Sequence, residues 1–255
     1  MNSKTRKLIQ QFVNDNIDSF HQNRILKLRN LRLNEVLKSK NPYLFRAKNL
    51  NLASDLITAI LDARLSSSEE GSFGGFLEKL AIYVARITGG GPQLKSPATG
   101  IDIDLTRRKV RYLIAVKSGK NWGNASQHKQ LQRNFMTATR VIRQSDKVVQ
   151  LQCTLGICYG NFKTINNGKF LHIGGQSFWE LISRDRQLYV DLIEPLGFKA
   201  EEHDQAFKKE KANIHNRLTR EFTIAYCEND GKIRWPKLVR FVSGNLPNRA
   251  IASPE

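Results

Sequence analysis

The chain has 255 residues, enough for one large domain or for a core domain with an added subdomain. Its 41 Lys and Arg residues outnumber 23 Asp and Glu residues, so the formal net charge is +18 at pH 7. A surface this basic attracts polyanions, and a nucleic acid is the leading candidate. No run of residues reaches the ~18 consecutive apolar positions of a membrane-spanning helix, and the polar N-terminus lacks the apolar stretch of a signal peptide.

The three cysteines Cys153, Cys158 and Cys227 are odd in number and lack C-x-x-C spacing, which argues against a zinc site and against a disulfide framework. Together with the missing signal peptide they predict a cytoplasmic protein, with no membrane partner. The positive charge gathers in two stretches. Residues 1–48 carry eleven Lys and Arg against three acids, and residues 105–147 carry eleven against Asp146 alone.

Residues 4–40 are predicted to be helical, because apolar residues recur every three or four positions from Leu8 to Phe20 and again from Leu26 to Leu37. Asn41-Pro42 ends this basic segment. Two roles fit it: a helix packed on the core of the protein, or an arm that grips a nucleic acid.

Two more helices are predicted over residues 50–65 and 72–87, separated by the polar run Ser66-Ser67-Ser68-Glu69-Glu70-Gly71. Ser72 is the expected N-cap of the second helix. Glu78 lies in an apolar sector of that helix, where a carboxylate is costly unless it is paired or binds a metal ion. The alternative is an acid favoured by the dipole of the N-terminal half of the helix.

Residues 100–117 predict a β-hairpin. Apolar residues alternate with Asp102 and Asp104, the charged turn Arg107-Arg108-Lys109 follows, and a strongly apolar second strand ends in Lys117. Pairing of these strands brings one or two carboxylates beside a lysine. That arrangement suits phosphoryl chemistry, because carboxylates hold Mg²⁺ and a lysine neutralises developing charge. The plain alternative is a charged hairpin without a catalytic role.

The loop 118–124 combines glycines, amide side chains, a lysine and a tryptophan in an exposed type of setting, and helix propensity resumes from Ala125 to about Gln144. Cations and amides are the groups that contact phosphates and bases. The residues predicted to contact a nucleic acid are Lys120, Asn121, Trp122, Asn124, Gln127, Lys129 and Arg133. Arg140 and Arg143 are available on outward faces of the same helix.

Strands are predicted from Val148 to Tyr159 and from Phe170 to Ile173, and helices over residues 201–227 and from Trp235 to Phe241. A short strand over residues 93–98 would complete the order helix, three strands, helix, strand. The predicted organisation is a basic helical arm over residues 1–48, a core over 49–200 and a helical extension over 201–255, forming one continuous globular unit.

The hairpin resembles the PD-(D/E)XK nuclease motif, with Gly100-Ile101-Asp102 in place of Pro-Asp and Ala115-Val116-Lys117 in place of Glu-x-Lys. Further blocks between about residues 40 and 243 resemble, in the same order, the PmeII family of type II restriction endonucleases. These blocks are Ser72-Phe73-Gly74-Gly75-Phe76-Leu77-Glu78, Gly100-Ile101-Asp102, Val116-Lys117-Ser118-Gly119, Asn121-Trp122-Gly123-Asn124, Cys158-Tyr159-Gly160, Gln176 with Phe178-Trp179-Glu180, and Ile193-Glu194-Pro195-Leu196-Gly197.

This resemblance implies an α/β PD-(D/E)XK fold, αβββαβ with a mixed central sheet and flanking helices, to which N- and C-terminal helices are added. It implies Mg²⁺-dependent cleavage of double-stranded DNA at a short specific sequence, leaving 5′-phosphate ends. A small residue often precedes x-Lys in the family, which fits Ala115. Asp102 is then the expected Mg²⁺ ligand, Lys117 the group that stabilises the reacting phosphate, and Glu78 or Asp104 the second carboxylate.

A homodimer is expected, because two copies of one active site cut the two strands of a palindrome most simply. Residues 201–243 are its expected interface, and a cognate DNA methyltransferase is the expected genetic partner. Two other functions fit the same residues: a structure-selective repair or junction-resolving nuclease, and a catalytically silent, sequence-specific DNA-binding protein, for which Ala115 is the argument.

Overall fold

The computed structural model describes residues 1–89, 98–145 and 150–244, and the strand predicted over residues 93–98 falls almost wholly outside these ranges. The elements in chain order are α1 (Ser3–Arg29), α2 (Leu33–Lys38), α3 (Pro42–Ala47), α4 (Ala53–Gly89), β1 (Ile103–Arg107), β2 (Val110–Gly119), α5 (Ala125–Ser145), β3 (Gln150–Tyr159), β4 (Ile165–Asn166), β5 (Leu171–Gly174), α6 (Gln176–Ser183), α7 (Leu188–Asp191), α8 (Ile193–Leu196), α9 (Ala200–Tyr226) and α10 (Trp235–Ser243). None of the helices in the described part of the chain is both long and apolar enough to cross a membrane.

The chain divides into two compact units. The first consists of Met1–Phe20 with Gly71–Ala200, and the second of His21–Glu70 with Glu201–Glu255. The basic segment 1–48 therefore supplies residues to both units, because its apolar positions belong to two different cores. Ile9 and Val13 pack in one core and Leu28 and Val36 in the other.

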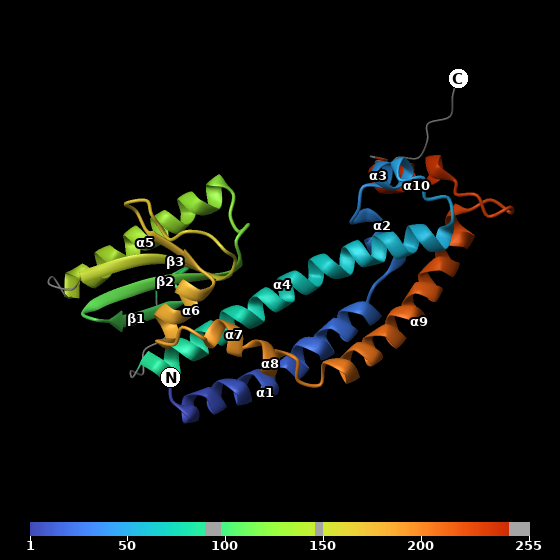
Figure 1. Cartoon of the computed structure of the whole chain (residues 1–255). Helices are drawn as coiled ribbons and strands as arrows, with labels where there is room; N and C mark the ends of the chain where they lie inside the picture. Colours follow the sequence, from blue (N-terminus) through green and yellow to red (C-terminus); the bar gives the residue numbers. More distant parts are fainter. Residues whose placement is uncertain (90–97, 146–149, 245–255) are drawn as a thin grey trace, which may run out of the picture. The chain divides into compact units, whose positions relative to one another are not determined.

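The first unit is built on a mixed five-stranded sheet of order β1-β2-β3-β5-β4. β1 pairs antiparallel with β2, whereas β2, β3 and β5 run parallel to one another and β4 pairs antiparallel with β5. Helices cover both faces of this sheet, α5 on one and α6 with the last turns of α4 on the other (Figure 1). The predicted α/β architecture is confirmed.

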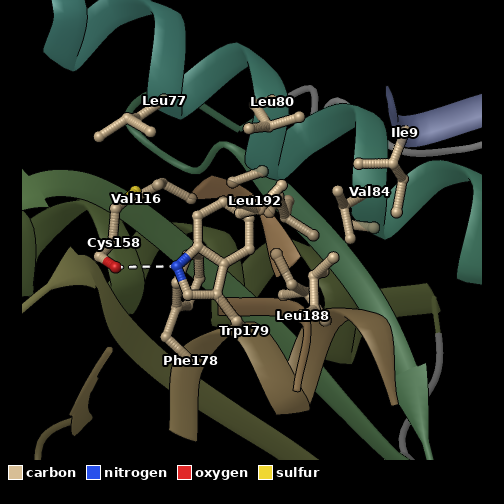
Figure 2. Close-up of a cluster of buried hydrophobic side chains, with 14 of the residues drawn as sticks. Ile9, Leu77, Leu80, Val84, Val116, Cys158, Phe178, Trp179, Leu188 and Leu192 are labelled. Atoms are coloured by element: carbon tan, nitrogen blue, oxygen red, sulfur yellow. Dashed lines mark hydrogen bonds between the residues drawn. The ribbon is translucent and has the colours of Figure 1, made fainter. Parts of the chain in front are cut away.

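Apolar side chains fill both sides of this sheet. Figure 2 shows one side, where Leu77, Leu80 and Val84 of α4 meet Val116 of β2 and the rings of α6. The indole of Trp179 donates a hydrogen bond to the carbonyl oxygen of Cys158 at 2.8 Å, so this large side chain is buried without an unpaired N–H group. On the other side, the apolar stripe of α5 packs on the same strands; its members are Leu131, Phe135 and Ala138.

The second unit contains only helices among its described elements. Its core is formed by the apolar faces of α1, α2, α4 and α9, and the α9 members are Phe207, Ile214, Leu218 and Phe222, as the sequence predicts. After α9, an isolated antiparallel β-bridge pairs the backbones of Cys227 and Ile233, and α10 follows.

The helix break predicted at residues 66–71 is wrong, because α4 runs without interruption from Ala53 to Gly89, and Ser72 is therefore not an N-cap. One tertiary contact offsets the poor helix propensity of this run, because Glu69 forms an ion pair with Arg24 at 2.7 Å. The Ser67 hydroxyl donates a hydrogen bond within the helix to the Ala63 carbonyl oxygen at 3.0 Å, which satisfies the hydroxyl without strengthening the helix. Tertiary contacts thus outweigh the local turn signal.

Candidate active site

The β1–β2 hairpin forms as predicted, with Ile103 opposite Ile114 and Arg107 opposite Val110. Its turn is shorter than expected: only Arg108 and Lys109 lie in it, both with positive φ (46° and 68°), whereas Arg107 is the buried last residue of β1. The Arg107 guanidinium donates a hydrogen bond to the Ile182 carbonyl oxygen at 2.9 Å, and burial lowers its pKa to about 10. Arg107 therefore joins β1 to α6 and is not part of a charged surface turn.

Asp102 lies immediately before β1 and is fixed against β2 by two hydrogen bonds. Its backbone N–H donates to the carbonyl oxygen of Ile114 at 2.9 Å, and its carboxylate Oδ2 accepts from the N–H of Val116 at 2.7 Å. This carboxylate is therefore held beside the stretch of β2 that ends in Lys117. Both belong to the predicted site.

Glu78 reaches the same place from α4. Its Oε1 lies 3.8 Å from Nζ of Lys117, and both side chains are partly exposed. Burial raises the pKa of the Glu78 carboxyl, the charge of Lys117 opposes that shift, and the charge of Asp102 adds to it. The structure thus brings Glu78, Asp102 and Lys117 together.

Asp104, the other candidate for the second carboxylate, is engaged elsewhere. Its two oxygens accept hydrogen bonds from Nε and Nη2 of Arg111 at 2.8 and 2.7 Å, a bidentate pair that is mostly buried. Binding a metal ion through Asp104 would require this pair to break. Arg111 was not among the predicted residues, although the register of a hairpin with a two-residue turn places it two positions from Asp104 on the neighbouring strand.

Ala115 is fully buried and packs with Leu131 and Phe135 of α5. The position that carries a carboxylate in the Glu-x-Lys pattern is here part of the core. A carboxylate from another element is therefore needed if the site is to have two, and Glu78 is suitably placed.

The close approach of α4 to β2 depends on Gly74. A Cβ atom at this position would lie 2.8 Å from Oγ and 3.2 Å from Cβ of Ser118, the residue after Lys117. Gly75 has no atom within 4 Å of the corresponding point. One glycine of the pair is thus at a contact and the other is not.

We expect Gly74→Ala to lower the cleavage rate by about tenfold, because α4 must shift and Glu78 moves away from Lys117. Gly75→Ala should leave the rate intact and raise the free energy of unfolding by about 0.5–1 kcal/mol, since alanine is the better helix former. Single-turnover cleavage and urea unfolding of the two variants test this. Identical behaviour of the pair would show that the contact with Ser118 is unimportant.

The predicted DNA-contacting residues separate into three groups. Asn124 and Gln127 form the N-cap of α5: the Asn124 side chain accepts from the Gln127 N–H at 3.0 Å, and the Gln127 side chain accepts from the Asn124 N–H at 2.9 Å. Trp122 is half-buried, with its ring 5.5 Å from Nζ of Lys117 and 5.3 Å from the ring of His128, so the expectation of an exposed tryptophan is wrong. Asn124 and Gln127 are exposed, and so are the remaining members, which are Lys120, Asn121, Lys129 and Arg133.

The donor set fits a hard divalent cation. In the described ranges no cluster of three or more His, Cys, Asp or Glu side chains has metal-binding geometry. Mg²⁺ nevertheless commonly takes only one or two carboxylates from a protein, with waters and substrate phosphate as its other ligands. The negative charge of Asp102 adds to the rise in the pKa of Glu78, and a bound cation would stabilise both carboxylates in their charged form. Burial raises the pKa of the nearby Cys158 thiol well above its ordinary range, so this thiol adds no negative charge beside the two carboxylates.

The protein is an α/β protein with a mixed sheet flanked by helices, and two carboxylates and a lysine meet beside its β1–β2 hairpin. This is the PD-(D/E)XK nuclease-like fold with helical additions. The family model of the type II restriction endonuclease EcoO109I matches residues 7–204, most of the chain. The chain belongs to this family of restriction endonucleases, whose substrate is DNA and whose members generally use a divalent metal ion. A comparison with curated proteins finds no match.

Proposed function

We propose that this protein is a Mg²⁺-dependent type II restriction endonuclease that hydrolyses both strands of DNA at a short specific sequence and leaves 5′-phosphate and 3′-hydroxyl ends. The observation that supports this most directly is the meeting of Lys117 and Glu78 at 3.8 Å beside the anchored carboxylate of Asp102. The resemblance of several sequence blocks to the PmeII family supports the same activity.

In the proposed mechanism Asp102 and Glu78 hold the cation. The bound ion would polarise the scissile phosphate and lower the pKa of a water molecule. The ammonium of Lys117 stabilises the negative charge that develops on the phosphate oxygens and helps to position the attacking water. The hydrogen bond from the Val116 N–H keeps the Asp102 carboxylate oriented, so little rearrangement is needed when the substrate arrives. Asp104 acts through its pair with Arg111 to hold the hairpin rather than to bind metal.

The active form is proposed to be a homodimer, encoded beside a DNA methyltransferase, with α9 and α10 at the interface. One feature of α9 favours an exposed contact surface: Ile224 is 76 % exposed, although the other large apolar residues of the helix are buried. Light scattering of the DNA complex tests the stoichiometry, and one subunit per site would exclude the dimer.

Digestion of supercoiled plasmid in the presence of Mg²⁺ tests the proposed function. We expect discrete fragments with 5′-phosphate ends, and no cleavage when EDTA removes the metal. Sequencing of the fragment ends gives the site and the overhang. Smeared products would instead indicate a nonspecific nuclease, cleavage confined to branched DNA a junction-resolving enzyme, and tight salt-sensitive binding without cleavage a silent DNA-binding protein.

A further inference from the structure

The outer face of α5 carries a straight line of long side chains. Lys129, Arg133, Met136, Arg140 and Arg143 follow one another at intervals of four, three, four and three residues. At ~100° per residue they lie within roughly 40° of one line along the helix, opposite the buried stripe of Leu131, Phe135 and Ala138. We call these five residues the α5 stripe.

All five residues of the stripe are exposed, and Met136 is 67 % exposed. A single exposed apolar side chain is ordinary by itself. What distinguishes Met136 is its place at the centre of four cations, two on each side along the helix. Val141 is a useful contrast, because it is 60 % exposed on the same helix but lies off the line.

No acidic residue occurs in α5, and in the described parts of the chain none of its four stripe cations forms an ion pair. Helix α9 of the second unit behaves differently, because Lys208, Lys211 and Arg217 each pair with a carboxylate. The cations of the stripe are therefore not neutralised within the described protein surface. They are available to an external anion.

A hollow of about 850 Å³ lies beside the stripe, between α5 and the turn that precedes β5. Phe135 and Met136 contribute apolar surface to it, and Arg140, Arg143 and Lys169 contribute cations. The cationic line thus continues from the helix onto a second element. A rod-like polyanion whose bases present apolar edges and faces matches this combination of charge and apolar surface.

We propose that α5 lies along duplex DNA, with Lys129, Arg133, Arg140 and Arg143 at phosphates and Met136 in apolar contact with a base. Duplex DNA fits the stripe because it is a polyanion and because the length of the stripe matches several base pairs. The 14-residue interval from Lys129 to Arg143 spans about 21 Å at ~1.5 Å per residue, which is about six base pairs at ~3.4 Å per pair. The major groove of B-DNA admits an α-helix. This inference rests on the proposed function for its substrate, and it makes Met136 a specificity-determining residue.

Phosphate contacts carry no sequence information, whereas an apolar contact with a base, such as a thymine methyl group, does. The two kinds of residue in the stripe therefore predict different effects. Loss of a cation should weaken binding to every duplex and reduce its salt dependence by about 0.9 in the slope of log K against log salt. Loss of the Met136 side chain should weaken binding to the specific site alone.

The test uses the full chain with Lys117→Ala, so that DNA is bound without being cut. A duplex enriched from a random pool by binding to this protein is compared with a scrambled duplex of the same composition. We expect Met136→Gln to lower affinity for the enriched duplex by about tenfold, with the scrambled duplex and the salt slope unchanged. Arg140→Gln should lower both affinities equally and make the slope shallower. Val141→Gln is the matched control and should change neither.

If Met136→Gln lost affinity equally for both duplexes, the proposed base contact would be overturned. If Arg140→Gln and Met136→Gln both bound DNA like the wild-type protein, the docking of α5 on DNA would be overturned, and an acidic protein would be the better partner for the stripe. Plasmid cleavage remains a separate measurement. If the protein cleaves plasmid but the α5 stripe variants bind DNA like the wild-type protein, only this inference is rejected. If the protein neither binds nor cuts DNA, the proposed function is rejected as well.

Discussion

Lys117→Ala is expected to abolish detectable plasmid cleavage while DNA affinity stays within a few-fold of the wild-type value. Its ammonium lies 3.8 Å from the Glu78 carboxylate and 5.5 Å from the centre of the Trp122 ring, and the side chain is 25 % exposed. A positive charge at the scissile phosphate acts mainly in the transition state, and its loss typically costs ~10²–10³-fold in rate or more. Binding, by contrast, is shared among many cations, so one of them contributes little.

Lys120→Ala is the matched control, because Lys120 is an exposed lysine three residues further along the chain. Its removal should weaken DNA binding slightly and leave the rate of single-turnover cleavage unchanged. Comparing the two variants at saturating DNA concentration separates the rate from the affinity. Near-normal cleavage by Lys117→Ala would remove this residue from the site and would contradict the match to the Glu-x-Lys pattern.

Two residues of the site could be predicted from local sequence because a hairpin is a local structure. Alternation defines the faces of β1, and pairing within the hairpin brings Asp102 beside the strand that contains Lys117, although the observed turn is one residue shorter than predicted. The position of Glu78 depends instead on how α4 packs against the sheet. Its apolar setting indicated a special role, and the raised pKa of its carboxyl agrees with that setting. The sequence left open whether Glu78 or Asp104 supplies the second carboxylate, because it gave no sign of the pair between Asp104 and Arg111 that favours Glu78.

The errors in the sequence-based predictions have a common cause, which is that distant contacts override local propensity. The run Ser66–Gly71 has the composition of a turn, but Arg24 lies 45 residues away in the chain and pairs with Glu69 in α4. Arg107 has the composition of a turn residue, yet the carbonyl oxygen of Ile182 accepts its hydrogen bond. The boundary between the two cores within α1 likewise has no local signal, since both halves of that helix are amphipathic and basic.

Glu78→Gln is expected to lower the cleavage rate by orders of magnitude at ordinary Mg²⁺ concentrations, and partial recovery is expected with Mn²⁺. The amide keeps the size of the side chain but removes a negative charge from the cation site, where Asp102 would be the only remaining carboxylate. A cation loses the attraction of one of its two protein charges when Glu78 becomes an amide, so it should be bound more weakly. Titration of the single-turnover rate with Mg²⁺ measures the effect, and the midpoint should move to higher concentration.

Asp104→Asn is the matched variant, because it removes one charge two residues from Asp102 in the same hairpin. Its bidentate pair with Arg111 would be weakened, so the free energy of unfolding should fall by about 1–3 kcal/mol, while the Mg²⁺ midpoint of cleavage should stay near the wild-type value. If Glu78 only favours its helix, Glu78→Gln should cost about 0.3–1 kcal/mol of stability and leave the rate unchanged. A fully active Glu78→Gln enzyme together with an inactive Asp104→Asn enzyme would assign the second carboxylate to Asp104, and Arg111 would then have to release it when the metal binds.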